Sequence, residues 1–252
     1  MRRRLLVLPA LLALGAIVTA CVTPPPPPDP SVPETVTKRF DFREGKLGWE
    51  AGFAEYHKDM EMQLESGLRP LPAELETGGT GFYIQAMNRS DDVFMYLTRG
   101  LTWDDGIVPN QDYRVTFRIV FASDAPTGAV GIGGAPGESV FLKAGAAPVR
   151  PEPYLDDDNW MMNVDKGGGN SGEGEAATIV GTVENGLPAE EVDFSNLPYV
   201  SLERTHEHSY IVTSSDDAEL WLLVGTDSGF EGLTGIYYQE ISVTVEPVLP
   251  AA

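Results

Sequence analysis

The sequence is poor in the residues from which disulfide frameworks and many catalytic sites are built. Its 252 residues include one cysteine, Cys21, and three histidines. A single thiol excludes a disulfide within the chain. Basic residues are also scarce, because 17 lysines and arginines stand against 38 acidic residues, which gives a net charge of −21. Since phosphate binding needs a positive field, this balance argues against nucleic acid as a partner.

No apolar run is long enough to predict a membrane span, but the N-terminus carries a shorter one. Residues 5–18 are apolar and follow three arginines, which is the pattern of a secretory leader. The run ends in "VTAC" at residues 18–21, which resembles the lipobox of bacterial lipoproteins. The resemblance implies that residues 1–20 are a signal peptide and that Cys21 carries acyl chains such as palmitate. Five prolines follow, so residues 21–35 are expected to form a lipidated, extended linker.

The lipobox also predicts a location. The protein is expected to be secreted across the inner membrane and anchored to the cell envelope as a lipoprotein. Val22 follows the cysteine, and by resemblance to lipoprotein sorting signals the lack of Asp there implies the outer membrane if the cell is Gram-negative. The membrane is therefore the first partner that we predict, through Cys21, while the oligomeric state is left open.

Helical periodicity is nearly absent, and alternation of apolar and polar residues recurs instead. It is clearest in "YRVTFRIVF" at 113–121 and in the closing "GIYYQEISVTV" at 235–245. Further strands are expected at 60–64, 82–88, 92–98, 128–132, 139–144, 160–164, 177–183, 208–214 and 219–225. Each apolar face must be buried against a second sheet. We therefore predict a single all-β domain over residues 36–247, a two-sheet β-sandwich of jelly-roll type, with a short tail at 248–252.

One segment has a composition that excludes a strand. Residues 166–175, "KGGGNSGEGE", are too rich in glycine for a strand and predict a flexible surface loop.

Ser228 in "GTDSGF" lies in a context similar to that of a serine-protease nucleophile. A catalytic serine needs a histidine base, and His57, His206 and His208 lie in no protease-like context. We expect Ser228 to stabilise a turn and the protein not to be an enzyme.

Aromatic residues beside carboxylates give one binding hypothesis. They occur in "LTWDDG" and in "YLDDDNW". An aromatic ring stacked on a sugar, flanked by hydrogen-bonding side chains, is a common way to bind carbohydrate. The alternative is that the rings plug the ends of the sandwich. The candidate ligand-binding residues are Trp103, Asp104, Tyr154, Asp158 and Trp160.

Carboxylates give a second, weaker hypothesis, a structural calcium ion. Extracellular β-sandwiches use calcium to pin loops to terminal strands, and Ca²⁺ takes oxygen ligands. The candidate ligands are Asp41, Glu44, Asp156 and Glu240. A solvated acidic face is the alternative, and "THEHS" offers two histidines to a metal without a third ligand. We predict no other cofactor.

The two ends of the predicted domain resemble a known class. "FDFREGKLGWE" at 40–50 is similar to the opening strand of carbohydrate-binding jelly-roll modules, and the closing strand is similar to their last one. These modules usually have Asp where Gln239 or Glu240 stands here. The resemblance implies a membrane-anchored, non-catalytic module that binds glycan. The alternatives are a sandwich-type glycosidase or lyase, and a structural envelope protein without a small ligand.

Overall fold

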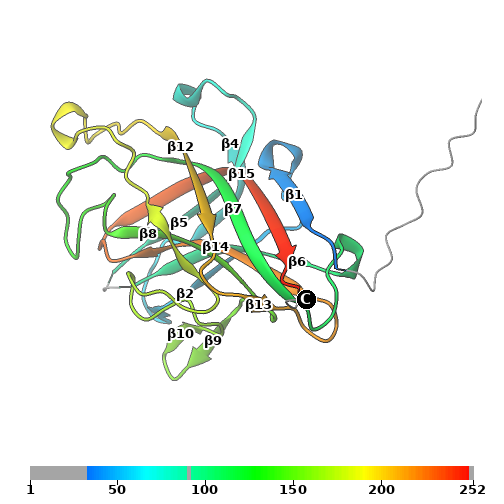
Figure 1. The fold of residues 1–252 in the computed structure, drawn as a ribbon. Helices are drawn as coiled ribbons and strands as arrows, with labels where there is room; N and C mark the ends of the chain where they lie inside the picture. The colour runs from blue at the N-terminus through cyan, green and yellow to red at the C-terminus, as the bar shows by residue number, and fades with distance from the viewer. Residues whose placement is uncertain (1–32, 90–91, 250–252) are drawn as a thin grey trace, which may run out of the picture.

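The computed structural model describes residues 33–89 and 92–249 (Figure 1). The predicted signal peptide, Cys21 and most of the predicted linker lie outside these described residues. In the described part of the chain, no helix combines the length and apolarity that crossing a membrane requires.

The larger of two packed sheets contains the last strand at its centre. Its order is β12-β7-β15-β5-β4, and β1 and β13 pair with β15 and β7 beside this path. Strand β15 pairs with β5 through its first half and with β1 through its second half. The strands of this sheet are β1 (Val36–Asp41), β4 (Glu65–Pro70), β5 (Thr80–Met87), β7 (Asp112–Ser123), β12 (Val200–Glu207), β13 (Val212–Thr213) and β15 (Leu233–Pro247).

The second sheet has five strands in the order β11-β8-β14-β6-β2, and a small third sheet has the order β3-β10-β9. Every strand pair in both sheets is antiparallel. The strands are β2 (Glu50–Ala54), β6 (Phe94–Leu101), β8 (Val140–Ala147), β11 (Thr178–Thr182) and β14 (Leu220–Ser228), then β3 (Tyr56–His57), β9 (Pro153–Asp156) and β10 (Asn159–Met162). Short 3-10 turns are η1 (Phe42–Glu44), η2 (Ala73–Leu75), η3 (Trp103–Asp105) and η4 (Ala189–Glu191).

The core lies between the two large sheets, as the alternation predicts. Tyr113, Val115, Phe117, Ile119 and Phe121 of β7 are all fully buried. They share one cluster with apolar residues of β14, β6 and β8 from the opposite sheet. The prediction of an all-β, two-sheet sandwich of jelly-roll type is therefore confirmed.

The outer face of the second sheet has a cover of its own. Phe94, Tyr96 and Leu223 point away from the main core and pack with Met162 of β10 and with Ala177. The glycine-rich loop takes part in this cover, since Lys166 is only 5 % exposed. The segment forms no strand, as predicted, but it is anchored to the sheet at Lys166 rather than lying free on the surface.

Two expected strands are absent and a third is displaced. Residues 128–132 form a loop, because Gly128 and the following Gly133 adopt positive φ, and Val130 is 97 % exposed. Residues 60–64 precede β4 without joining it, and Gln63 has a φ of 46° that breaks the extended run. The strand expected at 208–214 is represented by β13 alone, while β12 comes before it.

Candidate functional site

A cavity of about 290 Å³ opens between β2 and β6 on one side and the β9–β10 hairpin on the other. This volume lies near the lower limit of small-molecule pockets, about 300 Å³. We call it the hairpin pocket. Its aromatic lining comes from four elements, and its polar lining is concentrated on β2 and on the segment before β9. The residues that matter for binding are Phe53, Tyr56, Tyr96 and Trp160, with Glu50, Arg150 and Glu152.

Strand pairing brings the aromatic walls together. Trp160 of β10 is paired with Tyr56 of β3, so their side chains stand beside each other. Tyr96 comes from β6 and lies across Gly52 of β2, where a Cβ atom would approach the tyrosine ring to 2.3 Å. Only glycine permits this close approach. Burial raises the pKa of Tyr56 and of Tyr96, so both hydroxyls stay protonated at neutral pH.

The polar side of the hairpin pocket is charged. The Arg150 guanidinium forms an ion pair with Glu50 of β2 and lies 5.5 Å from the Trp221 ring centre. Glu152 follows two residues later, between two prolines. The pocket thus offers aromatic faces on one side and both donors and acceptors on the other. Such a lining suits a polar ligand that also has an apolar face, as a sugar ring has.

The structure separates the predicted sugar-contacting residues. Trp160 lines the hairpin pocket. Tyr154 pairs with Met161, the residue after Trp160. Because side chains alternate along a strand, Tyr154 faces the side of the hairpin opposite to Trp160, and it is 48 % exposed there. Asp158 forms an ion pair of 2.5 Å with Lys58 at the hairpin turn.

Trp103 and Asp104 lie elsewhere, in η3 after β6. Trp103 is 46 % exposed, and the next acidic residue, Asp105, pairs with Lys38 of β1 at 2.7 Å. No residue of η3 lines the hairpin pocket. The five predicted residues therefore do not form one site, and a sugar contact at Trp103 remains a prediction of its own.

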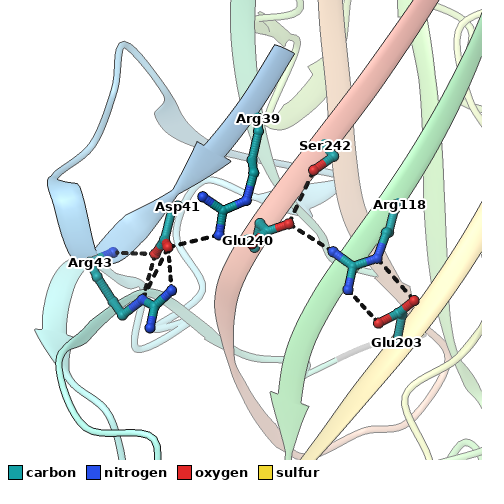
Figure 2. Close-up of polar contacts among 7 residues, drawn as sticks. All are labelled: Arg39, Asp41, Arg43, Arg118, Glu203, Glu240 and Ser242. Carbon is teal, nitrogen blue, oxygen red and sulfur yellow. Dashed lines mark hydrogen bonds and ion pairs between the residues drawn. The ribbon is translucent and has the colours of Figure 1, made fainter. Parts of the chain in front are cut away.

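The predicted calcium ligands Asp41 and Glu240 lie on the outer face of the larger sheet, where arginines pair with both. Asp41 accepts hydrogen bonds from Arg43 Nε at 2.8 Å and from Arg39 at 3.0 Å. Glu240 accepts from Arg118 at 2.7 Å and also pairs with Arg39. Figure 2 shows the resulting row of alternating charges, which runs Arg43, Asp41, Arg39, Glu240, Arg118, Glu203.

In this row the negative charges of the carboxylates are compensated by arginine guanidinium groups. The Arg43 guanidinium beside Asp41 lowers the pKa of that carboxyl to about 2. Glu44 lies in η1, and Asp156 ends β9 in a different sheet. Over residues 33–89 and 92–249, no group of three or more His, Cys, Asp or Glu side chains is arranged to hold a metal ion. Calcium binding stays a prediction from sequence.

Ser228 and the histidines have local structural roles. The buried Ser228 hydroxyl donates to the Phe230 carbonyl at 3.0 Å, as expected for a turn residue. The Thr178 hydroxyl lies 2.7 Å from His206 Nε2 and 3.0 Å from His208 Nδ1. These bonds tie β12 and its continuation to β11.

Sequence reasoning missed most of the hairpin pocket. Arg150 and Glu152 lie in "RPEP", where prolines fix the backbone around two charges, and this stretch could have been noticed. Glu50 lies 100 positions earlier than its partner Arg150. Nothing in the local sequence links two such distant segments.

Comparison with known proteins identifies no family. No protein-family model and no curated protein matches the chain. Among solved structures, it resembles a module from a study of promiscuous specificity in β-sandwich carbohydrate-binding modules, at 13 % identity and a TM-score of 0.35. That match covers 83 % of this chain and 61 % of the other, so the chain spans less than two thirds of that protein.

Two further matches show the same low level of similarity. One is TmCBM27, a carbohydrate-binding module described for specific mannan recognition, at 13 % identity, 84 % and 98 % coverage and a TM-score of 0.36. The other is an arabinose-bound α-L-arabinofuranosidase, MgGH51, at 12 % identity, 82 % and 24 % coverage and a TM-score of 0.36. Similarity this low identifies neither a family nor a ligand.

Proposed function

We propose that the protein is a secreted, membrane-anchored lipoprotein whose β-sandwich is a non-catalytic module that binds carbohydrate in the hairpin pocket. One observation carries the proposal: Trp160, Tyr56 and Tyr96 meet the charged side chains of Glu50 and Arg150 in a single cavity. The partly exposed rings of Trp160 and Tyr56 can stack on the apolar face of a sugar, while Tyr96, which is 1 % exposed, contributes only to the wall of the cavity. The charged groups can bond the hydroxyls of the sugar.

The same pocket supports binding better than hydrolysis. A glycosidase needs two carboxyl groups on either side of the scissile bond, about 5–9 Å apart. The acidic residues that line the pocket are Glu50 and Glu152. The carboxyl group of Glu50 is already paired with the Arg150 guanidinium, so it is not free to flank a scissile bond together with Glu152. We therefore propose a module without catalytic activity.

Binding is tested on the full-length chain with a glycan array and then by titration with the best soluble ligand. Trp160→Ala is expected to weaken binding by about tenfold or more, since an aromatic contact of about 1.4 kcal/mol corresponds to that factor. Tyr154→Ala, on the opposite face of the same hairpin, is the matched control and should bind as the unaltered protein does, while Trp103→Ala tests the separate prediction of a sugar contact in η3. Unchanged binding by Trp160→Ala would exclude the hairpin pocket.

The remaining parts of the proposal have separate tests. Metabolic labelling with palmitate should mark the protein, and Cys21→Ser should abolish the label and release the protein from the membrane fraction. Incubation with the bound glycan should release no reducing ends. If it does, and Glu152→Gln stops the release, the protein is an enzyme and the non-catalytic part of the proposal fails.

A further inference from the structure

A cluster of charged side chains lies buried on the outer face of the second sheet. Lys143 of β8 and Asp227 of β14 are both fully buried, and Lys143 Nζ lies 2.7 Å from Asp227 Oδ2. The two strands are direct neighbours, and the register pairs Lys143 with Gly225, two residues before Asp227. Alternation therefore places both side chains on the same face of the sheet.

The glycine-rich loop closes over this pair and adds a second cation. Lys166 Nζ lies 2.9 Å from the same Asp227 Oδ2, so that one oxygen accepts from two ammonium groups. The backbone carbonyl of Lys166 in turn accepts a hydrogen bond from Lys143 Nζ at 3.1 Å. These contacts fix the amine of Lys143 against the carboxyl group of Asp227 in a site closed to water.

The other oxygen of Asp227 is left without a partner. Oδ1 of Asp227 is buried and unbonded, and so is Oδ1 of the half-buried Asp92. Burial, together with the nearby Asp227, raises the pKa of Asp92 to about 8, so Asp92 carries a proton at neutral pH. The protonated Asp92 carboxyl group is thus a hydrogen-bond donor available to Asp227, and a hydrogen bond between the two groups contributes to the raised pKa of Asp92.

We propose that Lys143 and Asp227 condense into an intramolecular isopeptide bond, with Asp92 as the group that transfers the proton. Asp92 gives its proton to Oδ1 of Asp227 and takes up one proton from the Lys143 ammonium. The neutral amine then attacks Cγ of Asp227, a second amine proton passes to Oδ1, and the C–Oδ1 bond breaks so that Oδ1 leaves as water. Asp92 ends protonated, as it began. The sum is one ammonium and one carboxylate giving one amide and one water, so no oxidant or other reactant is needed. The Lys166 ammonium on Oδ2 stabilises the negative charge that develops there.

The surroundings favour the condensed form. Buried ions lose their hydration, and forming the amide removes two of them. Lys166 then has the Asp92 carboxyl group, 3.7 Å away, as its remaining acidic neighbour, and the partnerless Oδ1 has left the site. Holding the two groups in contact in a dry site supplies the high effective concentration that condensation needs. Ion pairing without reaction, and a bond to Lys166 in place of Lys143, are the competing outcomes.

Mass spectrometry of the full-length protein decides between them. The protein is denatured, digested with trypsin and analysed against its sequence. We expect the segment with Lys143 to remain joined to the segment with Asp227, to weigh one water less than the two parts together, and to be uncut after Lys143. Separate segments of full mass would overturn the proposal, and a link at Lys166 would overturn the assignment of the nucleophile.

Variants test the roles of the individual residues, with circular dichroism confirming that each one folds. Lys143→Arg keeps the charge and should show no mass loss. Asp227→Asn should lose ammonia in place of water, since its leaving group is then an amide nitrogen. Asp92→Asn should leave the ion pair in place but unreacted. A folded Asp92→Asn protein that still loses water would show that Asp92 takes no part in the reaction. The mass measurement on the unaltered protein tests the bond itself even if a variant fails to fold.

Discussion

Trp49 makes possible a sharp test of how the core of this protein is stabilised. Its side chain is 1 % exposed, and its ring meets Phe40 and Phe42 edge-on, with centroid distances of 5.6 and 6.4 Å. The indole Nε1 is buried without a hydrogen-bond partner. The residue therefore combines a large packing contribution with an unsatisfied donor, and two substitutions separate these effects.

Trp49→Ala removes both the ring and the donor. Replacing a buried aromatic residue by alanine costs about 3–5 kcal/mol, which is a large part of a typical unfolding free energy of about 5–15 kcal/mol. Trp49→Phe keeps an aromatic ring against Phe40. It leaves a smaller cavity that costs about 1–2 kcal/mol, and it deletes a buried donor whose lack of a partner costs about 1–3 kcal/mol. The net change for Trp49→Phe is expected to lie within about 1 kcal/mol of zero.

Urea unfolding followed by far-ultraviolet circular dichroism measures these differences. Fluorescence is less suitable, because the chain has four tryptophans. Trp103→Phe, at an exposed position in η3, is the control and should leave the unfolding midpoint unchanged. If Trp49→Phe is destabilised as strongly as Trp49→Ala, the unsatisfied donor has no energetic weight, and the reasoning is wrong.

Two further predictions concern the charged row and the hairpin pocket. The pKa of Asp41 is lowered to about 2 by Arg43, from 3.8, so its carboxylate stabilises the fold above pH 4 and this stabilisation is lost as the pH falls towards 2. Asp41→Asn should lower the unfolding free energy by about 1–2 kcal/mol at neutral pH. In urea unfolding at different pH values, the variant should also lose less unfolding free energy on acidification than the unaltered protein. An unchanged acid dependence would contradict the ion-pair account. Gly52→Ala should clash with Tyr96, lower the unfolding free energy by about 1–3 kcal/mol and weaken glycan binding. Gly168→Ala, which adds its methyl group to open space, is the matched control, and equal melting temperatures for the two alanine variants would show that the contact with Tyr96 does not matter.

The sequence predicts this fold where one face of a strand is buried and the other is not. In β7 the period-two pattern survives along the strand, because residues such as Phe117 meet the core and residues such as Arg118 meet solvent. The same reasoning fails at 128–132, because Gly128 and Gly133 turn the backbone at the two ends of this stretch. Alternation predicts a strand only if the backbone can remain extended.

The candidate site is less predictable, because it depends on contacts between distant segments. Trp160 could be found as an aromatic residue beside carboxylates, but the same criterion also selects Trp103, which lies outside the pocket. The "GWE" stretch resembles part of a sugar-binding module, yet Trp49 itself is a core residue, and its neighbour Glu50 reaches the pocket. Local sequence indicates which side chains can bind a ligand, while strand order decides which of them meet.

The pairing of the first strand with the last has a mechanical consequence. Val36 at the start of β1 lies opposite Val245 near the end of β15, and the pairing continues to Asp41 opposite Glu240 (Figure 1). Because β15 is the central strand of the larger sheet, a pull on the segment before β1 would load this short ribbon first and pass from it directly into the middle of that sheet. Rows of backbone hydrogen bonds that are loaded along the strand must rupture together, so a pull directed along β1 would be resisted by the whole β1–β15 ribbon and not by one bond at a time.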